Sequence, residues 1–267
     1  MLGMYKVFKN LKRNFFNSPI DSIITSSLIC IFLFFFLSTF NWFLYIADWT
    51  VVLNNLSTYG FGVYPTNERW RALLWLVIIA LLTIFTLTGY KSIYIRKVIK
   101  PMWIISVPVG LILLAGGLGL TPVETRNWGG LTLTLVLTLF SALIALPLGI
   151  GLALGRQSKI NLIRNLCSLY IDIMRAFPLI TVLFFGQLLI PLFLPMEVDI
   201  NRVLRAILAF SLFTSAYIAE DIRGGLQTVP QTQKEASQVL GFNNRQTMQI
   251  IVLPQALRTA LPSLTNQ

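Results

Sequence analysis

The chain has 267 residues, of which 55% are hydrophobic and 12% are charged, and its formal net charge is +11. Soluble globular domains carry about 25% charged residues, so this composition and a mean hydropathy of +0.74 exclude a water-soluble fold. The apolar segments are long and do not alternate with polar residues, which excludes a transmembrane β-barrel and predicts an all-α, polytopic membrane helical bundle.

Six uncharged runs are the predicted membrane spans. In chain order they cover residues 22–47, 72–90, 101–123, 127–155, 176–196 and 206–219. A helix needs about 20 mostly apolar residues to cross the hydrocarbon core. The last run is shorter than that, so we expect its helix to extend past Arg205 or Glu220.

The basic residues fall mainly in alternate connections between these runs. Most of the 21 Lys and Arg precede the first run or follow the second, fourth and sixth. The positive-inside rule therefore predicts a multi-pass protein with its N-terminus and its C-terminus in the cytoplasm. The excess of positive charge reflects this topology, and no nucleic-acid partner is expected.

Residues 1–125 form the first predicted domain, an N-terminal membrane region with three spans and an outside loop over residues 48–71. Aromatic residues beside a span usually anchor it at the interface, and ligand binding is the alternative. The aromatic residues of this loop are Trp49, Tyr59, Tyr64 and Trp70. We expect them to be interface anchors.

Residues 126–267 form the second predicted domain, a membrane core with three spans and the polar loop that follows them. Small residues are frequent in its first span, including Gly149, Gly151 and Gly155. No Lys follows these glycines as in a phosphate-binding loop, so they are predicted to serve close helix packing. The chain has no His and only two Cys, which excludes a His or Cys metal site, and no bound cofactor is expected.

A polar stretch at about residues 227–254 follows the sixth run and is predicted to fold as helix, turn and helix on the cytoplasmic side. Thr232 and Glu235 fit a capping box that would start the first helix. The spacing of Ala236, Val239 and Leu240 then predicts one apolar helix face.

Gly241 is predicted to end this first helix in a left-handed conformation. Asn243 or Asn244 is expected to cap the second helix, which would run until Pro254 interrupts it. On physical grounds alone, the loop could either pack on the rest of the chain or dock another protein.

Seven residues in this loop have a spacing that resembles the EAA loop of ABC import permeases. That loop reads EAA, three spacers, G, nine spacers, then I-x-LP, and the matching residues are Glu235, Ala236, Ser237, Gly241, Ile251, Leu253 and Pro254. Ser237 departs from the pattern by replacing the second Ala. Residues 171–179 and 217–227 are also similar to segments of the polar amino acid branch, especially its general L-amino acid and glutamate/glutamine/aspartate permeases.

The resemblance covers residues 128–267. It implies the type I permease fold of an ABC importer, a bacterial inner (plasma) membrane location, and a path for polar L-amino acids. The implied partners are a separate ATPase that uses ATP, a second permease subunit in a hetero- or homodimer, an extracytoplasmic substrate-binding protein and membrane lipid. The EAA loop would couple to the ATPase, and the chain itself would be no enzyme and have no catalytic residue. Such permeases have further spans after this loop, so we expect the chain as given to lack its C-terminal part.

Two other classes remain open, an ion-gradient-driven secondary transporter or channel, and a membrane anchor or assembly factor. A secondary transporter usually shows paired repeats and charges at mid-membrane, which this sequence does not show. Asp172 and Arg175 are predicted to form an ion pair, with contact along a substrate path as the alternative. No residue is assigned to substrate binding.

Overall fold

The computed structural model describes residues 14–89, 91–193, 195 and 200–267. The named elements in the described residues are all helices, which confirms the predicted all-α class. The chain divides into two compact units, Met1–Leu56 and Ser57–Gln267. The predicted division at residue 125 concerns composition and function, and it stays a prediction.

The first unit contains the helix α2 (Pro19–Asn41), a π-helical turn η1 (Trp42–Ile46) and the short helix α3 (Thr50–Asn54). Ser18 caps α2 by accepting a hydrogen bond of 3.1 Å from the backbone N–H of Asp21. No residue of α2 is buried, although the helix is apolar on all sides. A helix of this kind belongs in lipid or between other apolar helices.

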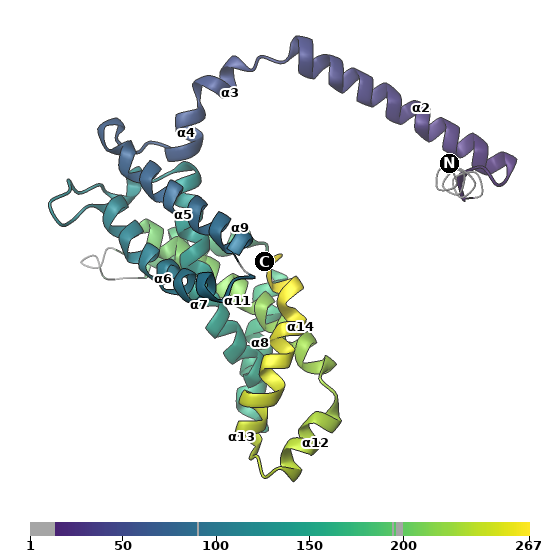
Figure 1. Ribbon diagram of the computed structural model, residues 1–267, viewed down its shortest axis with the longest axis vertical. Helices are drawn as coiled ribbons and strands as arrows, with labels where there is room; N and C mark the ends of the chain where they lie inside the picture. The colour runs from purple at the N-terminus through teal and green to yellow at the C-terminus, as the bar shows by residue number, and fades with distance from the viewer. Residues whose placement is uncertain (1–13, 90, 194, 196–199) are drawn as a thin grey trace. The chain divides into compact units, whose positions relative to one another are not determined.

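The second unit is a helical bundle, drawn in Figure 1. Its longer helices are α5 (Arg69–Gly89), α6 (Ile93–Ala115), α7 (Gly130–Arg156), α8 (Asn161–Ala176), α11 (Arg202–Thr228) and α14 (Leu253–Leu264). Shorter elements connect them: α4 (Leu56–Phe61), η2 (Thr66–Glu68), η3 (Thr125–Asn127), α9 (Leu179–Phe184), η4 (Phe185–Leu189), α10 (Ile190–Leu192), α12 (Gln231–Val239), α13 (Asn244–Gln246) and η5 (Thr247–Val252).

Five of the six predicted runs coincide with helices that are long and apolar enough to cross a membrane. These helical segments are Pro19–Ile46, Thr66–Gly89, Ile93–Ala115, Gly130–Arg156 and Arg202–Thr228. The last extends past both Arg205 and Glu220, as predicted. The chain therefore has the helices of a multi-pass membrane protein.

The predicted run at residues 176–196 is not one straight span. Its helical part, Leu179–Leu192, is joined to α8 at an angle of 105°. Pro178 explains the break, because a proline disfavours the helical conformation in the residue before it, and Phe177 is extended with ψ at 143°.

α7 and α11 pack closely in the centre of the second unit. A Cβ atom added to Gly149 would lie 2.4 Å from Cγ2 of Ile218, and one added to Gly155 would lie 2.5 Å from Sγ of Cys167. The absence of a side chain at these positions lets the helices approach, as the sequence predicts. A Cβ atom at Gly151 would meet nothing within 4 Å, so this glycine has no such role.

Tyr64 corrects the prediction for the aromatic loop. Its side chain is only 1% exposed, and its hydroxyl donates a 2.8 Å hydrogen bond to the carbonyl oxygen of Leu114. Burial raises its pKa above the ordinary value for tyrosine. Trp49, Tyr59 and Trp70 are exposed, as interface residues can be. Tyr64 is therefore a core residue.

Candidate functional site

The polar loop that resembles the EAA motif forms α12, α13 and η5. Figure 1 shows α12 and α13 at one end of the second unit. α12 begins after Pro230 and has no side-chain cap, so the predicted capping box of Thr232 and Glu235 is wrong. The reason is that Thr232 lies inside the first turn of the helix, whereas a capping residue must precede that turn.

The predicted turn at Gly241 is confirmed. Gly241 has a φ of +84°, in the left-handed region that favours glycine. The backbone N–H of Gly241 donates to the carbonyl of Gln238 at 3.0 Å, and that of Phe242 donates to the carbonyl of Ser237 at 3.1 Å. These two hydrogen bonds form a Schellman motif, which satisfies the free carbonyls at the end of α12.

A capping box does occur eleven residues after the predicted one, at Asn243. The Asn243 side chain accepts from the backbone N–H of Gln246 at 2.9 Å, and the Gln246 side chain accepts from the backbone N–H of Asn243 at 3.0 Å. The predicted cap at Asn243 or Asn244 is thus confirmed at Asn243.

The second helix of the loop continues through Pro254 instead of ending there. The π-helical turn η5 leads directly into α14, which has Pro254 in its first turn. A proline lacks an N–H and its ring clashes with the carbonyl four residues earlier. We attribute the wider π turn just before Pro254 to this clash, because such a turn lets the helical direction continue.

The seven motif residues lie in two different environments. Glu235 and Ala236 are exposed on α12, while Ile251 and Leu253 are half-buried where η5 meets α14. Pro254 is exposed, and Ser237 is buried. The apolar face of α12 is almost free, since Val239 is 88% exposed and Leu240 is 77% exposed. The structure therefore joins a free apolar helix face to a helix that packs into the bundle.

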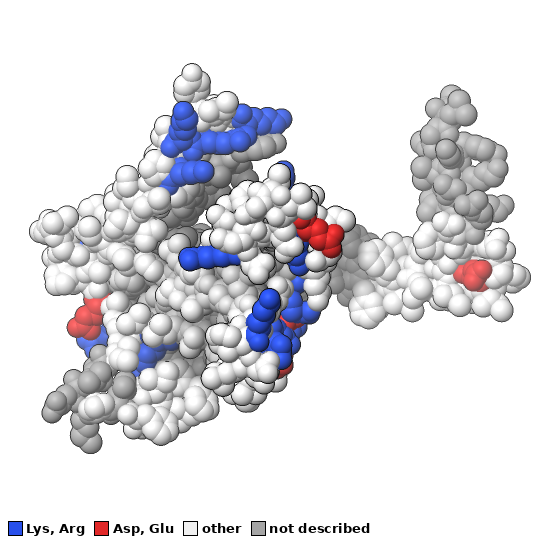
Figure 2. All heavy atoms as spheres, turned by 90° about the horizontal axis from the view of Figure 1, so that it is seen from below, with Lys and Arg blue, Asp and Glu red and all other residues white. Residues whose placement is uncertain are grey.

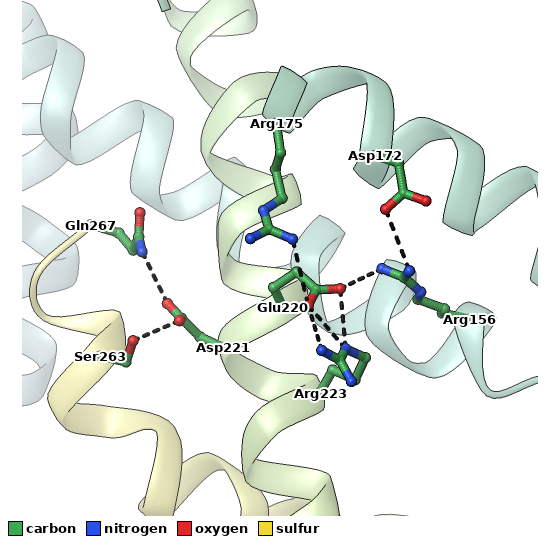
Figure 3. Close-up of polar contacts among 8 residues, drawn as sticks. All are labelled: Arg156, Asp172, Arg175, Glu220, Asp221, Arg223, Ser263 and Gln267. Carbon is green, nitrogen blue, oxygen red and sulfur yellow. Dashed lines mark hydrogen bonds and ion pairs between the residues drawn. The ribbon is translucent and has the colours of Figure 1, made fainter. Parts of the chain in front are cut away.

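A cluster of charged side chains joins three helices of the second unit (Figure 3). Glu220 of α11, whose side chain is only 14% exposed, pairs with Arg156 at the end of α7 and with Arg223 one turn further along α11. Arg223 approaches both carboxylate oxygens, at 2.7 to 3.1 Å. Arg175 of α8 completes the cluster at 3.5 Å. One carboxylate of α11 thus pairs with arginines at the C-terminal ends of α7 and α8.

The predicted ion pair between Asp172 and Arg175 is wrong. Asp172 pairs instead with Arg156 at 3.4 Å, and Arg175 turns toward Glu220 and lies 5.6 Å from the ring centre of Tyr217. Sequence spacing favoured neighbours on one helix, but the packing of α7 against α8 supplies a closer partner. Arg156 was not predicted as part of a cluster, because no local pattern links it to residues 64 positions away.

Asp221 connects α11 to the helix that follows the loop. Its carboxylate accepts hydrogen bonds from the Ser263 hydroxyl at 2.6 Å and from the Gln267 side chain at 3.1 Å, as Figure 3 shows. The two helices also touch at their backbones, since a Cβ atom at Gly225 would lie 2.3 Å from the carbonyl oxygen of Ala256. α14 is therefore held against α11 at two levels.

The end of the second unit that carries α12 and α13 is viewed in Figure 2, and basic side chains predominate on it. Acidic side chains near them are fewer. An excess of Lys and Arg at one end of a helical bundle is typical of the cytoplasmic side of a membrane protein.

These features describe a class of protein, a multi-pass membrane protein with a structured polar loop at one end. Residues 145–267 match the family described as binding-protein-dependent transport system inner membrane component. The chain is 38% identical over 225 residues to the inner membrane amino-acid ABC transporter permease protein YhdY of Escherichia coli (strain K12), covering 82% of this chain and 60% of that protein.

The chain is also similar to the glutamate/glutamine/aspartate/asparagine transport system permease protein BztC of Rhodobacter capsulatus. The identity is 41% over 149 residues, which cover 56% of this chain and 34% of that protein. A crystal structure of an amino acid ABC transporter with histidines is 34% identical, with a TM-score of 0.46, and the match covers 51% of this chain and 63% of that one.

The chain spans 60% of the first relative's length and 34% of the second's. The chain is therefore similar to permeases of amino-acid ABC transporters over part of their length, and the match to binding-protein-dependent inner membrane components lies in residues 145–267.

Proposed function

We propose that the chain is the membrane permease of an ATP-driven ABC importer for polar L-amino acids, with a type I permease fold. The observation that carries the proposal is the exposed apolar face of α12, which includes Val239 and Leu240, on a loop that matches the EAA spacing. An apolar face of this kind, rigidly presented outside the spans, fits a docking helix for another protein. The names of the relatives support amino acids as the substrate class.

The partners of this importer are an ATPase that binds and hydrolyses ATP, a second permease subunit, and an extracytoplasmic binding protein that delivers the substrate. The ATPase docks on α12 through Glu235, Ala236 and the apolar residues beside them. The basic end of the second unit faces the cytoplasm, with both termini on that side, in the inner membrane of a bacterium.

Coupling follows from how α12 is attached. Closure of the ATPases displaces α12, and η5 transmits the movement to α14 through Ile251 and Leu253. α14 is fixed to α11 by Asp221 and by the contact at Gly225. The movement therefore reaches the spans that line the path, and binding at one site shifts the equilibrium between inward and outward openings.

The test uses the complete permease in vesicles, with the ATPase and binding protein encoded beside it, and radiolabelled glutamate or glutamine. Val239→Asp and Leu240→Asp place a charge on the docking face, so ATPase association and ATP-dependent uptake should fall at least tenfold. Gln238→Asp is the matched control, because it places the same charge on the opposite side of α12. Uptake that needs an ion gradient and no ATPase would instead establish a secondary transporter.

A further inference from the structure

A buried hydroxyl group of α12 makes the contact between this helix and the segment that follows it. Among its nine residues, all of them described, Ser237 is the one that is buried, with 3% exposure. Its Oγ lies 2.8 Å from Oγ1 of Thr247, which is itself 6% exposed and begins η5. The apolar residues of α12 face away, so burial of apolar side chains does not fix the orientation of this helix.

The directions of the two hydrogen bonds of Ser237 follow because each hydroxyl has only one proton to donate. The Ser237 hydroxyl lies 2.7 Å from the carbonyl oxygen of Lys234, an acceptor that has no proton to give. The Ser237 hydroxyl therefore donates its single proton to the backbone carbonyl of Lys234, and its oxygen accepts the proton of the Thr247 hydroxyl. The result is a relay from Thr247 to Ser237 to the backbone of α12.

We propose that Ser237 and Thr247 are positioning residues that set the angle of α12 relative to η5 and α14. This inference rests on the proposed function, in which α12 docks the ATPase. Hydrogen bonds are directional, so the relay holds α12 in one rotation about its axis and keeps the apolar face pointing outward. The departure of Ser237 from the EAA pattern is matched by the hydroxyl of Thr247, which would lose its buried acceptor if position 237 were Ala.

This geometry predicts an unequal pair of single variants. In Ser237→Ala the buried hydroxyl of Thr247 has no acceptor, which should weaken ATPase binding by about 5- to 100-fold. In Thr247→Val the Ser237 hydroxyl still donates to Lys234, so the loss should be at most about 5-fold. The double variant also breaks the relay but leaves no hydroxyl unpaired, so its loss should equal that of Thr247→Val, at most about 5-fold, and not exceed that of Ser237→Ala. Thr247→Ser keeps the donor and should behave as the unaltered protein.

The experiment titrates the purified permease, in detergent, with the ATPase encoded beside it, and measures uptake per ATP hydrolysed in vesicles. A role limited to folding would lower the yield of folded protein and leave this ratio unchanged, whereas a changed angle of α12 lowers the ratio. Equal losses in the two single variants, or additive loss in the double variant, overturn the inference.

If Ser237→Ala does not fold, the comparison of Thr247→Val with Thr247→Ser and with the double variant decides the question in the same way. If the unaltered permease binds the ATPase and Ser237→Ala binds equally well, only the relay is wrong. If the unaltered permease binds no ATPase, the proposed function itself is wrong.

Discussion

Single residues decide the electrostatics where α7, α8 and α11 meet. Glu220 is largely shielded from water and forms ion pairs with three arginines. Asp172 neutralises part of their remaining positive charge. Removing a carboxylate from such a centre costs more than removing one from the surface, because the arginines stay close together without a counter-charge.

Glu220→Gln should lower the free energy of unfolding by roughly 1–3 kcal/mol, because the arginines lose their shared negative charge and one of its two acceptor oxygens. Thermal unfolding of the purified protein in detergent measures this change. Asp172→Asn is the control, since its side chain is 60% exposed and surface ion pairs contribute about 0–1 kcal/mol. Equal changes for the two variants would contradict a special role for Glu220.

Gly241 is required for its conformation and not for space. Gly241→Val should strain the turn by on the order of 1–3 kcal/mol, because a β-branched residue rarely adopts a positive φ. Hydrogen–deuterium exchange of residues 231–246 should then be faster. Gly241→Asn should stay close to the unaltered protein, since Asn tolerates this conformation and an added Cβ meets no atom within 4 Å. Fast exchange in both variants would show that the site needs glycine for another reason.

At the scale of elements, α7 shows how glycines in one helix differ in what they do. Gly149 faces α11 and Gly151 faces open space, although the sequence gives both the same apolar surroundings. The difference arises from the rotation of α7 about its axis, which is set by contacts with helices far away in the chain.

Gly149→Ala should therefore destabilise the protein by about 1–3 kcal/mol through overpacking against Ile218 and the carbonyl oxygen of Ser215. Gly151→Ala should be neutral or stabilising by about 0.5–1 kcal/mol, because alanine favours the helix. Unfolding of the two variants in the same detergent compares them directly. A larger loss for Gly151→Ala would mean that α7 is rotated differently.

At the scale of the whole molecule, the spans and the distribution of charge were predictable, because hydropathy and basic residues are properties of the sequence itself. Hydropathy identified five runs, and the conformational preferences of Gly and Asn identified the turn at Gly241 and the cap at Asn243. The missing information was spatial. Pro178 marks the break in the sequence, but the 105° angle there, the hydrogen bond of the buried Tyr64 to Leu114, 50 positions away, and the partners of Arg156 on α8 and α11 depend on tertiary packing.

The predicted topology is tested with reporter fusions in the membrane. Fusions after Asn67 and Asn161 should report opposite sides, with Asn161 in the cytoplasm, because the basic residues gather in the connections on that side. A fusion after Leu240 is an internal check and should agree with the one after Asn161. The same side for Asn67 and Asn161 would refute the predicted topology.

The turn between α12 and α13 is closed by its own hydrogen bonds, the Schellman motif after α12 and the capping box at Asn243. The conformation of residues 231–246 is therefore held by hydrogen bonds within the segment. Few residues outside it fix α12 to the rest of the chain. For protein engineering, this means that the segment could be exchanged as a unit if the residues at 237 and 247 are kept as a matched pair. Loops could be exchanged between permeases by pairing the residues at 237 and 247, and the spans would need no redesign.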